Sequence, residues 1–289
     1  MKIFAIFTAL IITWLAFYFY SNQFKPSNIS LALPPNQVHA PILMTQEVKT
    51  LFEQPFSYLG EGNQAYALTS KDGKFVIKFF KNTPITSQSW MDLFSSFPFI
   101  ETYLNTKRLR AQRKYERVFN AYEIAYAHDQ QHCGLMYIHL YQSNDLKSSA
   151  KAIDALGISH SIDLDNYAFI IQKKGEPLKS LLKRELSEGK IELVKTRLQQ
   201  VIEMYIAEYQ NGIFDHDHNL MTNIGFADGI PMRIDVGKLV LDPTYTSKDI
   251  YLKDLDKIIH QRIIKWFKRH SPDHTNDVLQ TLETFLLTN

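Results

Sequence analysis

Amide and carboxylate side chains gather in one stretch of the chain, NGIFDHDHNLMTNIGFADGIPMRIDVGKLVLD at residues 211–242. Asn223 and Asp235 stand on either side of the turn sequence ADGIP, so a hairpin would place both at its open end. Hard oxygen ligands in such a position can hold Mg²⁺ on a nucleotide. Asp217 precedes them in a loop, where a carboxylate can orient or deprotonate an attacking hydroxyl. The stretch therefore indicates metal-assisted chemistry at a hydroxyl group.

Two other metals fit the same stretch less well. Asp215, Asp217 and Asn219 have the Asp-x-Asp-x-Asn spacing that opens a calcium loop. Such a loop also needs glycine at its sixth position and glutamate at its twelfth. Those positions hold Leu220 and Phe226, which excludes a calcium loop. His216 and His218 have no third ligand at a spacing typical of zinc, so hydrogen bonding or surface exposure is the better interpretation of both.

A second group of residues, near the front of the chain, is suited to binding phosphate. Gly60 and Gly62 lie in the sequence LGEGNQAYA, where paired glycines on a strand turn let backbone N–H groups approach a phosphate. Lys78 follows Gly60 by eighteen residues and ends an apolar strand, from which it can reach a phosphate under the turn. Taken singly, these features are also typical of an ordinary β-turn and an ordinary strand lysine.

The order of these motifs resembles that of the protein-kinase-like superfamily over residues 55–245. GEG, VIK, DHDHNLMTN and DVG match the family's glycine loop, strand lysine, catalytic-loop Asp…Asn pair and Asp-x-Gly metal motif. The resemblance implies that ATP and Mg²⁺ bind between two lobes and that the γ-phosphoryl group is transferred. The sequence GEPLKSLL also looks like that of the minimal bacterial sugar kinases in this superfamily.

The resemblance also implies roles for individual residues. Lys78 would contact the α- and β-phosphates, act as one of two catalytic residues, and pair with Glu116, for which Glu123 is the alternative partner. The implied nucleotide-binding set is Gly60, Gly62, Ala65, Lys78, Glu116, Gln172 and Lys174, of which Gln172 and Lys174 would lie along the adenine edge.

The remaining implied roles fall on residues 211–242. Asn223 and Asp235 would hold Mg²⁺, and Asp217 would be the catalytic base. The stretch departs from the family pattern, because Asp215 stands where most kinases have histidine. The spacing from Asp217 to Asn223 is also one residue longer than usual, so that the usual spacing leads back to His218 instead.

The rest of the chain supplies elements that would position these residues. Strands are predicted within residues 56–80, 133–140 and 167–172, and helices over 106–128, 178–186, 191–210 and 249–287. A β-rich first half and a helical second half predict an α+β fold. With the resemblance, we expect a bilobal protein-kinase-like fold with a β-rich N-lobe (51–174), a shortened helical C-lobe (175–289) and an N-terminal transmembrane helix.

Residues 3–20, IFAIFTALIITWLAFYFY, carry no charge and are long enough to predict a transmembrane anchor. A cleaved signal peptide is the alternative, but no small-x-small cleavage site follows. We assign 1–22 to the anchor and 23–50 to a proline-containing linker. The expected location is therefore a single-pass membrane protein, with the soluble domain in the cytoplasm because ATP is used there; the flanking charges leave the sidedness open.

The composition narrows the classes of partner. The 289 residues include 45% hydrophobic and 21% charged residues, as in folded globular proteins, and the formal charge is +2. A nearly balanced charge gives no indication of nucleic-acid binding. Cys133 is the single cysteine, which excludes an intrachain disulfide and a cysteine-based zinc cluster.

These observations predict a membrane-anchored, ATP-dependent phosphotransferase whose expected partners are a nucleotide, Mg²⁺, the membrane and an unknown hydroxyl acceptor. The alternative is a catalytically inactive pseudokinase that serves as a binding or scaffold module. The altered sequence around Asp215 favours the alternative, whereas the joint presence of Lys78, Asn223 and Asp235 favours the enzyme.

Overall fold

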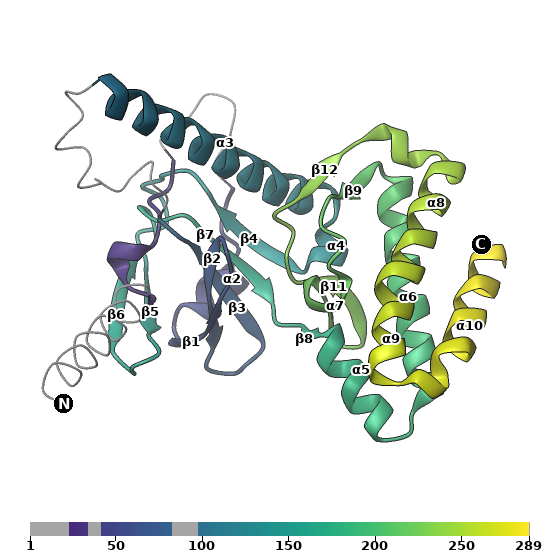
Figure 1. Cartoon of the computed structure of the whole chain (residues 1–289). Helices are drawn as coiled ribbons and strands as arrows, with labels where there is room; N and C mark the ends of the chain where they lie inside the picture. The colour runs from purple at the N-terminus through teal and green to yellow at the C-terminus, as the bar shows by residue number, and fades with distance from the viewer. Residues whose placement is uncertain (1–22, 34–41, 83–97, 289) are drawn as a thin grey trace, which may run out of the picture. The chain divides into compact units, whose positions relative to one another are not determined.

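The structure, a computed structural model, describes residues 23–33, 42–82 and 98–288 (Figure 1). These residues form two compact units. The first contains the chain up to Ala111 and His139–Ile171, and the second contains Gln112–Ile138 and the chain from Gln172 onward. The chain thus passes between the units within α3 (Pro98–His128), β4 (Leu135–His139) and β7 (Phe169–Lys173).

The first unit is built on a sheet. Its strands lie in a seven-stranded sheet with the order β4-β7-β3-β2-β1-β5-β6. The strands other than β4 and β7 are β1 (Phe56–Glu61), β2 (Ala65–Ser70), β3 (Phe75–Phe80), β5 (Ser149–Ile153) and β6 (Ser159–Asp163), and two short helices are η1 (Pro26–Asn28) and α2 (Gln46–Leu51). β1, β2 and β3 form consecutive antiparallel hairpins, which confirms that strands lie within residues 56–80.

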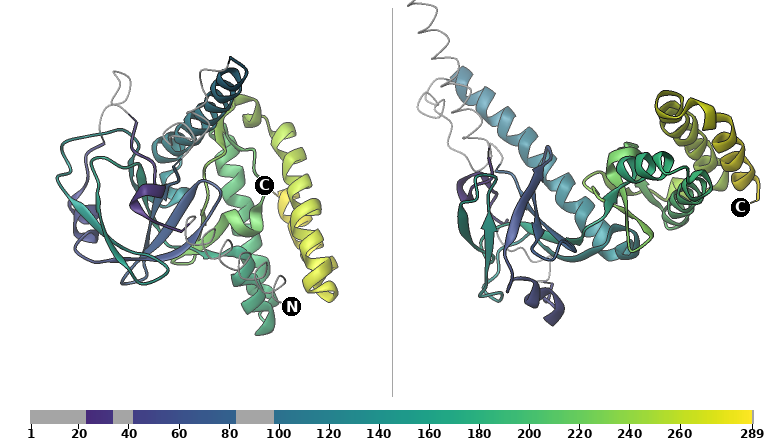
Figure 2. Two further views of the ribbon diagram at one scale, coloured as in Figure 1. Left: turned by 60° about the vertical axis from the view of Figure 1, so that its left-hand side comes forward. Right: turned by 90° about the horizontal axis from the view of Figure 1, so that it is seen from below.

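The second unit is mainly helical (Figures 1 and 2). Helix α6 packs against α5, α8 and α10, and its buried residues recur at helical spacing, which explains why it forms here. The helices after α3 are α4 (Gln130–Cys133), α5 (Leu178–Ser187), α6 (Ile191–Gln210), α7 (Leu220–Asn223), η3 (Pro243–Thr246), α8 (Lys248–Ile258), the π-helical η4 (Ile259–Ile264), α9 (Lys265–His270), η5 (Pro272–His274) and α10 (Thr275–Thr288).

Short strands hold the polar stretch in the second unit. β8 (Glu176–Pro177), β10 (Ile224–Ala227) and β11 (Ile230–Arg233) form one sheet with the order β11-β10-β8. β9 (Ile213–Asp215) and β12 (Leu239–Leu241) form another. Gly212, with a φ of 69°, separates α6 from β9, as the predicted helix stop at this point requires.

The predicted fold class needs correction. In place of a bilobal kinase-like α+β fold, the structure has a mixed α/β arrangement with a curled sheet. The sheet is mixed because β5 runs parallel to β1, pairing Phe56 with Ala152. The sequence did not predict β5 and β6, because small or polar residues fill most of their positions and only Ala150, Ala152 and Ile162 are buried.

The predicted membrane anchor and single-pass location also need correction. Among the residues that the structure describes, no helix has the length and apolar character needed to cross a bilayer. The apolar run at residues 3–20, on which the prediction depended, lies outside the described residues.

Candidate functional site

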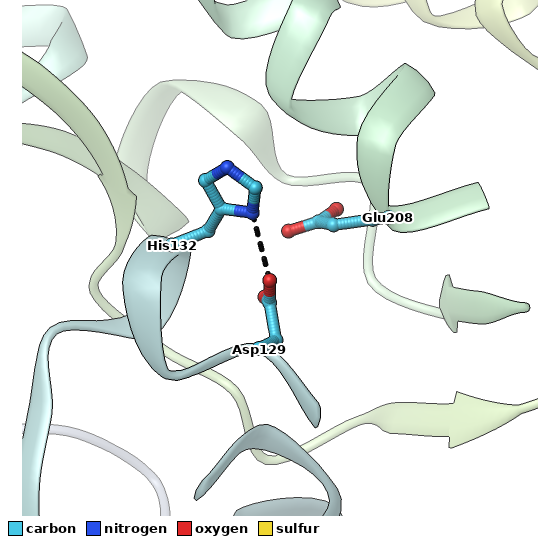
Figure 3. A group of neighbouring side chains, drawn as sticks. All are labelled: Asp129, His132 and Glu208. Atoms are coloured by element: carbon cyan, nitrogen blue, oxygen red, sulfur yellow. Dashed lines mark hydrogen bonds and ion pairs between the residues drawn. The ribbon is translucent and has the colours of Figure 1, made fainter. Parts of the chain in front are cut away.

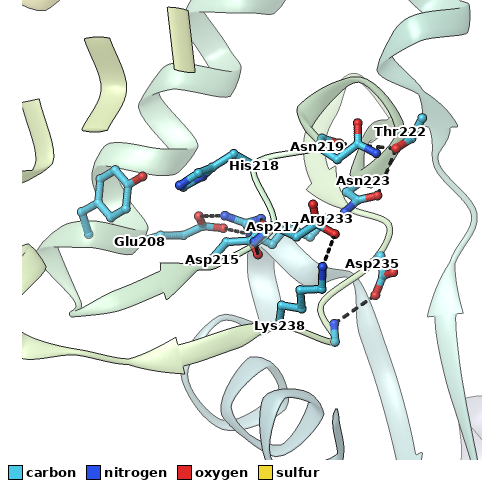
Figure 4. A network of polar contacts seen from close by, with 12 residues as sticks. Glu208, Asp215, Asp217, His218, Asn219, Thr222, Asn223, Arg233, Asp235 and Lys238 are labelled. Carbon is cyan, nitrogen blue, oxygen red and sulfur yellow. Dashed lines mark hydrogen bonds and ion pairs between the residues drawn. The ribbon is translucent and has the colours of Figure 1, made fainter. Parts of the chain in front are cut away.

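The β10–β11 hairpin brings Asn223 and Asp235 together (Figure 4). Ile224 pairs with Arg233 at the open end of the hairpin. The carbonyl oxygen of Asn223 accepts hydrogen bonds from the backbone N–H groups of Ile234, at 2.6 Å, and Asp235, at 3.4 Å. The prediction that these two residues flank one hairpin is therefore confirmed, while their role as metal ligands stays a prediction.

The turn of this hairpin has the sequence best suited to it. Ala227 pairs with Ile230, which leaves Asp228 and Gly229 as a two-residue loop. Their φ angles are 52° and 81°, the left-handed values that a tight hairpin needs and that Asp-Gly sequences adopt readily. The open end of the hairpin is thus fixed by local sequence as well as by packing.

Asp217 lies beside this pair, in the loop between β9 and α7. Its Oδ2 is 2.9 Å from Nζ of Lys238, and its backbone N–H donates to Oδ1 of Asp215 at 2.7 Å. Burial opposes ionisation of Asp217, but the hydrogen bond and charge of Lys238, with the side chain of Asn223, outweigh it and lower its pKa. The carboxylate is therefore suited to orienting a hydroxyl more than to removing its proton.

His218 does not take the place of Asp217. Its Nε2 faces Oδ2 of Asp254 on α8 at 3.5 Å, and the same oxygen accepts the hydroxyl of Tyr209 at 2.6 Å. Figure 4 shows the imidazole directed away from Lys238. Of the two residues that spacing offered as the base, Asp217 is the one that shares contacts with Asn223.

A buried ion cluster, which the sequence did not predict, contacts the loop that carries Asp217. Arg233 is fully buried and donates through Nε and Nη2 to both oxygens of Glu208, at 2.7 and 2.5 Å. Its Nη1 donates to Oδ2 of Asp215 at 2.5 Å. Since Asp215 also accepts from the backbone of Asp217, the guanidinium of Arg233 is linked to the candidate base through one carboxylate.

One signal in the sequence would have revealed Glu208. The buried face of α6 includes Val201, Tyr205 and Glu208, so a glutamate occupies a position that helical spacing reserves for an apolar residue. A glutamate in such a position needs a buried cation. No comparable pattern identifies Arg233, because its partners come from distant parts of the chain.

Gln172 is buried in the second unit, and its amide is already engaged. Nε2 donates to the carbonyl oxygens of Cys133, at 2.6 Å, and Arg233, at 2.7 Å. A nucleotide contact at this position would therefore come from the main chain. Lys174 is half-buried two residues later, and its adenine-edge role, like that of Gln172, stays a prediction.

Cys133 is buried and chemically protected. Its Sγ lies 3.4 Å from the carbonyl oxygen of Ala125, and burial raises the pKa of the thiol to about 12. A protonated, buried thiol is a poor nucleophile and a poor metal ligand.

The predicted phosphate-binding residues of the first unit share one face of its sheet. Gly60 pairs with Ala67 across β1 and β2, and Ala67 pairs with Lys78 across β2 and β3. Directly paired residues point to the same face, so the side chain of Lys78 emerges on the face below the Gly60 backbone. Gly62 donates to the carbonyl oxygen of Ala65 at 2.9 Å and closes the turn.

Glu116 and Glu123 both lie on the part of α3 that belongs to the second unit. Glu116 is exposed, and its Oε1 accepts from Nε2 of Gln112 at 2.9 Å. Glu123 is half-buried. The pairing of Lys78 with either glutamate stays a prediction.

The first unit contains the residue types of a nucleophilic triad, in the wrong order. The hydroxyl of Ser143 donates to Oδ1 of Asp165 at 2.5 Å, while Nε2 of His139 lies 3.2 Å from Oγ of Ser143. In a working triad the imidazole stands between the hydroxyl and the carboxylate. Asp165 instead accepts the backbone N–H groups of Leu146 and Lys147, which identifies it as the anchor of a turn.

A second group of potential metal ligands lies in the second unit. Asp129, His132 and Glu208 each place a ligand atom within 4.8 Å of the others (Figure 3). Such a triad of two carboxylates and an imidazole could hold a metal ion.

Comparison with known proteins finds likeness among solved structures alone. No protein-family model matches the chain, and no curated protein matches it. Among solved structures, one similar chain is described as "Medium resolution structure of the bifunctional kinase- methyltransferase WbdD". It is 12% identical over 68% of this chain and 34% of that chain, with a TM-score of 0.37. The present chain thus spans about a third of that protein.

Proposed function

We propose that the chain is a Mg²⁺-dependent phosphotransferase that moves the γ-phosphoryl group of ATP to a hydroxyl acceptor. One observation carries the proposal: the open end of the β10–β11 hairpin gathers Asn223 and Asp235, with Asp217 and Lys238 beside them. Two hard oxygen ligands, a carboxylate and an exposed ammonium are the groups that phosphoryl transfer needs.

The residues present fit a magnesium ion. Asp235 is exposed, and its Oδ1 accepts from the backbone N–H of Gly237 at 2.9 Å, which fixes the carboxylate. Oδ1 of Asn223 accepts the hydroxyl of Thr222 at 3.1 Å and is likewise oriented. Carboxylate and amide oxygens are ligands that Mg²⁺ takes in nucleotide sites. When bound, the ion would neutralise negative charge on the phosphates.

Asp217 and Lys238 would act on the transferring group and its acceptor. Lys238 is about half exposed, with 53% of its side-chain surface accessible, so its ammonium can meet a phosphoryl oxygen that enters from solvent. Asp217, with its lowered pKa, would accept a hydrogen bond from the acceptor hydroxyl and hold it in line. Gly60, Gly62 and Lys78 of the first unit stay predicted phosphate-binding residues.

A second candidate function is a nucleotide-binding scaffold without turnover. The observation that favours it is the ion pair between Asp217 and Lys238, which engages the candidate base before any substrate arrives. The two functions differ in turnover, since both predict nucleotide binding.

Asp235→Ala tests the proposal, with Asp228→Asn as the matched control. Asp228 lies at the closed end of the same hairpin, and asparagine accepts its left-handed φ of 52°. We expect Asp235→Ala to lower Mg²⁺-dependent transfer from γ-labelled ATP, to water or to the protein itself, by at least about 100-fold. Asp228→Asn should leave it unchanged.

Two results would contradict different parts of this proposal. Unchanged turnover in Asp235→Ala would refute the metal role of that residue. ATP binding by the wild-type chain, measured as a Mg²⁺-dependent thermal shift, without any transfer would establish the scaffold instead.

A further inference from the structure

The buried charges behind the polar loop do not balance. Asp129, Glu208 and Asp215 are carboxylates with 5%, 1% and 3% of their surface exposed, and the cation among them is Arg233, at 0%. Three carboxylates and one guanidinium leave the cluster short of two positive charges. Because uncompensated charge in a protein interior is costly, the cluster requires further cations or protons.

A cation that balances these charges would have a defined position beside Arg233. Asp129 and His132 lie at the turn from α3 into α4, and Glu208 reaches them from α6 (Figure 3). Nδ1 of His132 is 2.8 Å from Oδ1 of Asp129. The other oxygen of that carboxylate, Oδ2, is fully buried and has no hydrogen-bond partner. An orphaned carboxylate oxygen in the interior is the kind of atom that a bound ion satisfies.

We propose that Asp129, His132 and Glu208 bind one Zn²⁺ ion, at a site separate from the nucleotide-linked Mg²⁺. Their ligand atoms already lie within 4.8 Å of one another, so small side-chain shifts suffice to enclose an ion. The ligand set of one imidazole and two carboxylates suits Zn²⁺, whereas Mg²⁺ and Ca²⁺ favour oxygen alone. One divalent ion supplies the two missing positive charges.

The contacts of Glu208 are compatible with this role. Arg233 donates to each carboxylate oxygen once, and each oxygen keeps a second lone pair for a metal. Arg233 would then hold the ligand in position from outside, as outer partners commonly do in metal sites. The ion would tie the α4 turn to α6 at the back of the loop that carries Asp217.

Protons are the rival source of positive charge. The hydrogen bond that His132 donates to Asp129 raises the pKa of His132, and burial, with the neighbouring carboxylate of Asp129, raises the pKa of Glu208. Protonation of both residues would neutralise the cluster without a metal, so a direct binding measurement is needed.

The test uses the full chain carrying Asp235→Ala, which removes the proposed Mg²⁺ ligand. After treatment with EDTA and dialysis, the protein is titrated with ZnCl₂ by calorimetry, and retained zinc is measured by mass spectrometry. We expect one equivalent of Zn²⁺ to bind. Adding His132→Gln, at a side chain that is 18% exposed, should weaken the affinity by more than about 100-fold, the upper range for losing an outer partner.

His260→Gln in the same background is the control. His260 also lies near two acidic residues, Asp256 and Glu283, but on the surface, and its replacement should leave the stoichiometry at one. Circular dichroism of the metal-free proteins shows which variants fold. No zinc binding by the parent, or equal binding by the folded His132→Gln variant, would overturn the proposal in favour of protons.

Discussion

At the scale of single residues, the candidate site divides into groups that local spacing reveals and groups that packing alone assembles. Asn223 and Asp235 were predictable because a two-residue turn fixes their relation. Glu208 and Arg233 are 25 residues apart, and their contact depends on α6 packing beside β11. Because buried charges are paired, a buried Glu208 implies some buried cation. The rule does not say which residue supplies it.

Arg233→Met should therefore destabilise the protein strongly. It leaves the buried carboxylates of Glu208 and Asp215 without their shared cation, a loss that typically costs about 3–5 kcal/mol in unfolding free energy. Urea denaturation measures the change.

Arg184→Met is the matched control for this substitution. Arg184 also donates to both carboxylate oxygens of one glutamate, Glu176, through the single nitrogen Nη1, but 52% of its side chain is exposed, so the expected loss is below about 1 kcal/mol. Equal losses in the two variants would show that the buried cluster is not a structural requirement.

At the scale of elements, turn chemistry was the most reliable signal in the sequence. Asp228 and Gly229 form the two-residue loop between β10 and β11, and the four residues 71–74, with Asp72 and Gly73 at their centre, connect β2 to β3. The strands β5 and β6 went unpredicted because SAKAI and SHSID read as polar, although Ala150, Ala152 and Ile162 are fully buried. Alternation with small residues gives too weak an apolar pattern over five positions.

Gly60→Ala separates a binding role of the β1–β2 turn from a folding role. A Cβ at Gly60 meets no heavy atom within 4 Å, and the backbone there does not have a positive φ. We expect the unfolding free energy to change by less than about 0.5 kcal/mol. Affinity for ATP should fall, since a methyl group would obstruct the approach of a phosphate to the backbone.

Gly225→Ala provides the contrast. A Cβ there would lie 2.7 Å from the carbonyl oxygen of Glu176 and 2.7 Å from Cδ1 of Ile234, so this variant should lose about 1–3 kcal/mol of stability. Should Gly60→Ala bind ATP as well as the wild type, the turn is not a phosphate site.

At the scale of the whole molecule, the sequence indicated two parts but not their composition. The predicted boundaries divide residues 51–289 once, after residue 174, and they stay a prediction. The segment Gln112–Ile138 belongs to the second compact unit, although it precedes His139–Ile171 of the first unit in sequence. Such a grouping depends on contacts between distant segments, which hydrophobic periodicity does not encode.

The first unit should lose stability in acid through His139. Burial lowers the pKa of His139 in the folded state, so its contribution is fully present above the unfolded value of about 6.5 and is lost as pH falls toward the folded value. The melting temperature of the wild type should fall more steeply below pH 6.5 than that of His139→Asn.

Asp165→Asn is the companion variant. Burial raises the pKa of Asp165, but hydrogen bonds from Ser143, Lys147 and Leu146 lower it more, so its contribution disappears only below about pH 4. Because the negative charge of Asp165 raises the pKa of His139, the melting temperature of this variant should fall at least as steeply as that of the wild type between pH 6.5 and 5. Parallel melting profiles for wild type and His139→Asn would contradict the role of His139.

The protected thiol of Cys133 makes the chain convenient for spectroscopy. With no other cysteine in the sequence, maleimide reagents meet no competing surface thiol. Cysteines introduced at the exposed positions Lys71 and Lys265, one in each unit, would accept a donor and acceptor dye pair selectively. Energy transfer between the dyes would then report whether the distance between the two labelled positions changes when ATP is added.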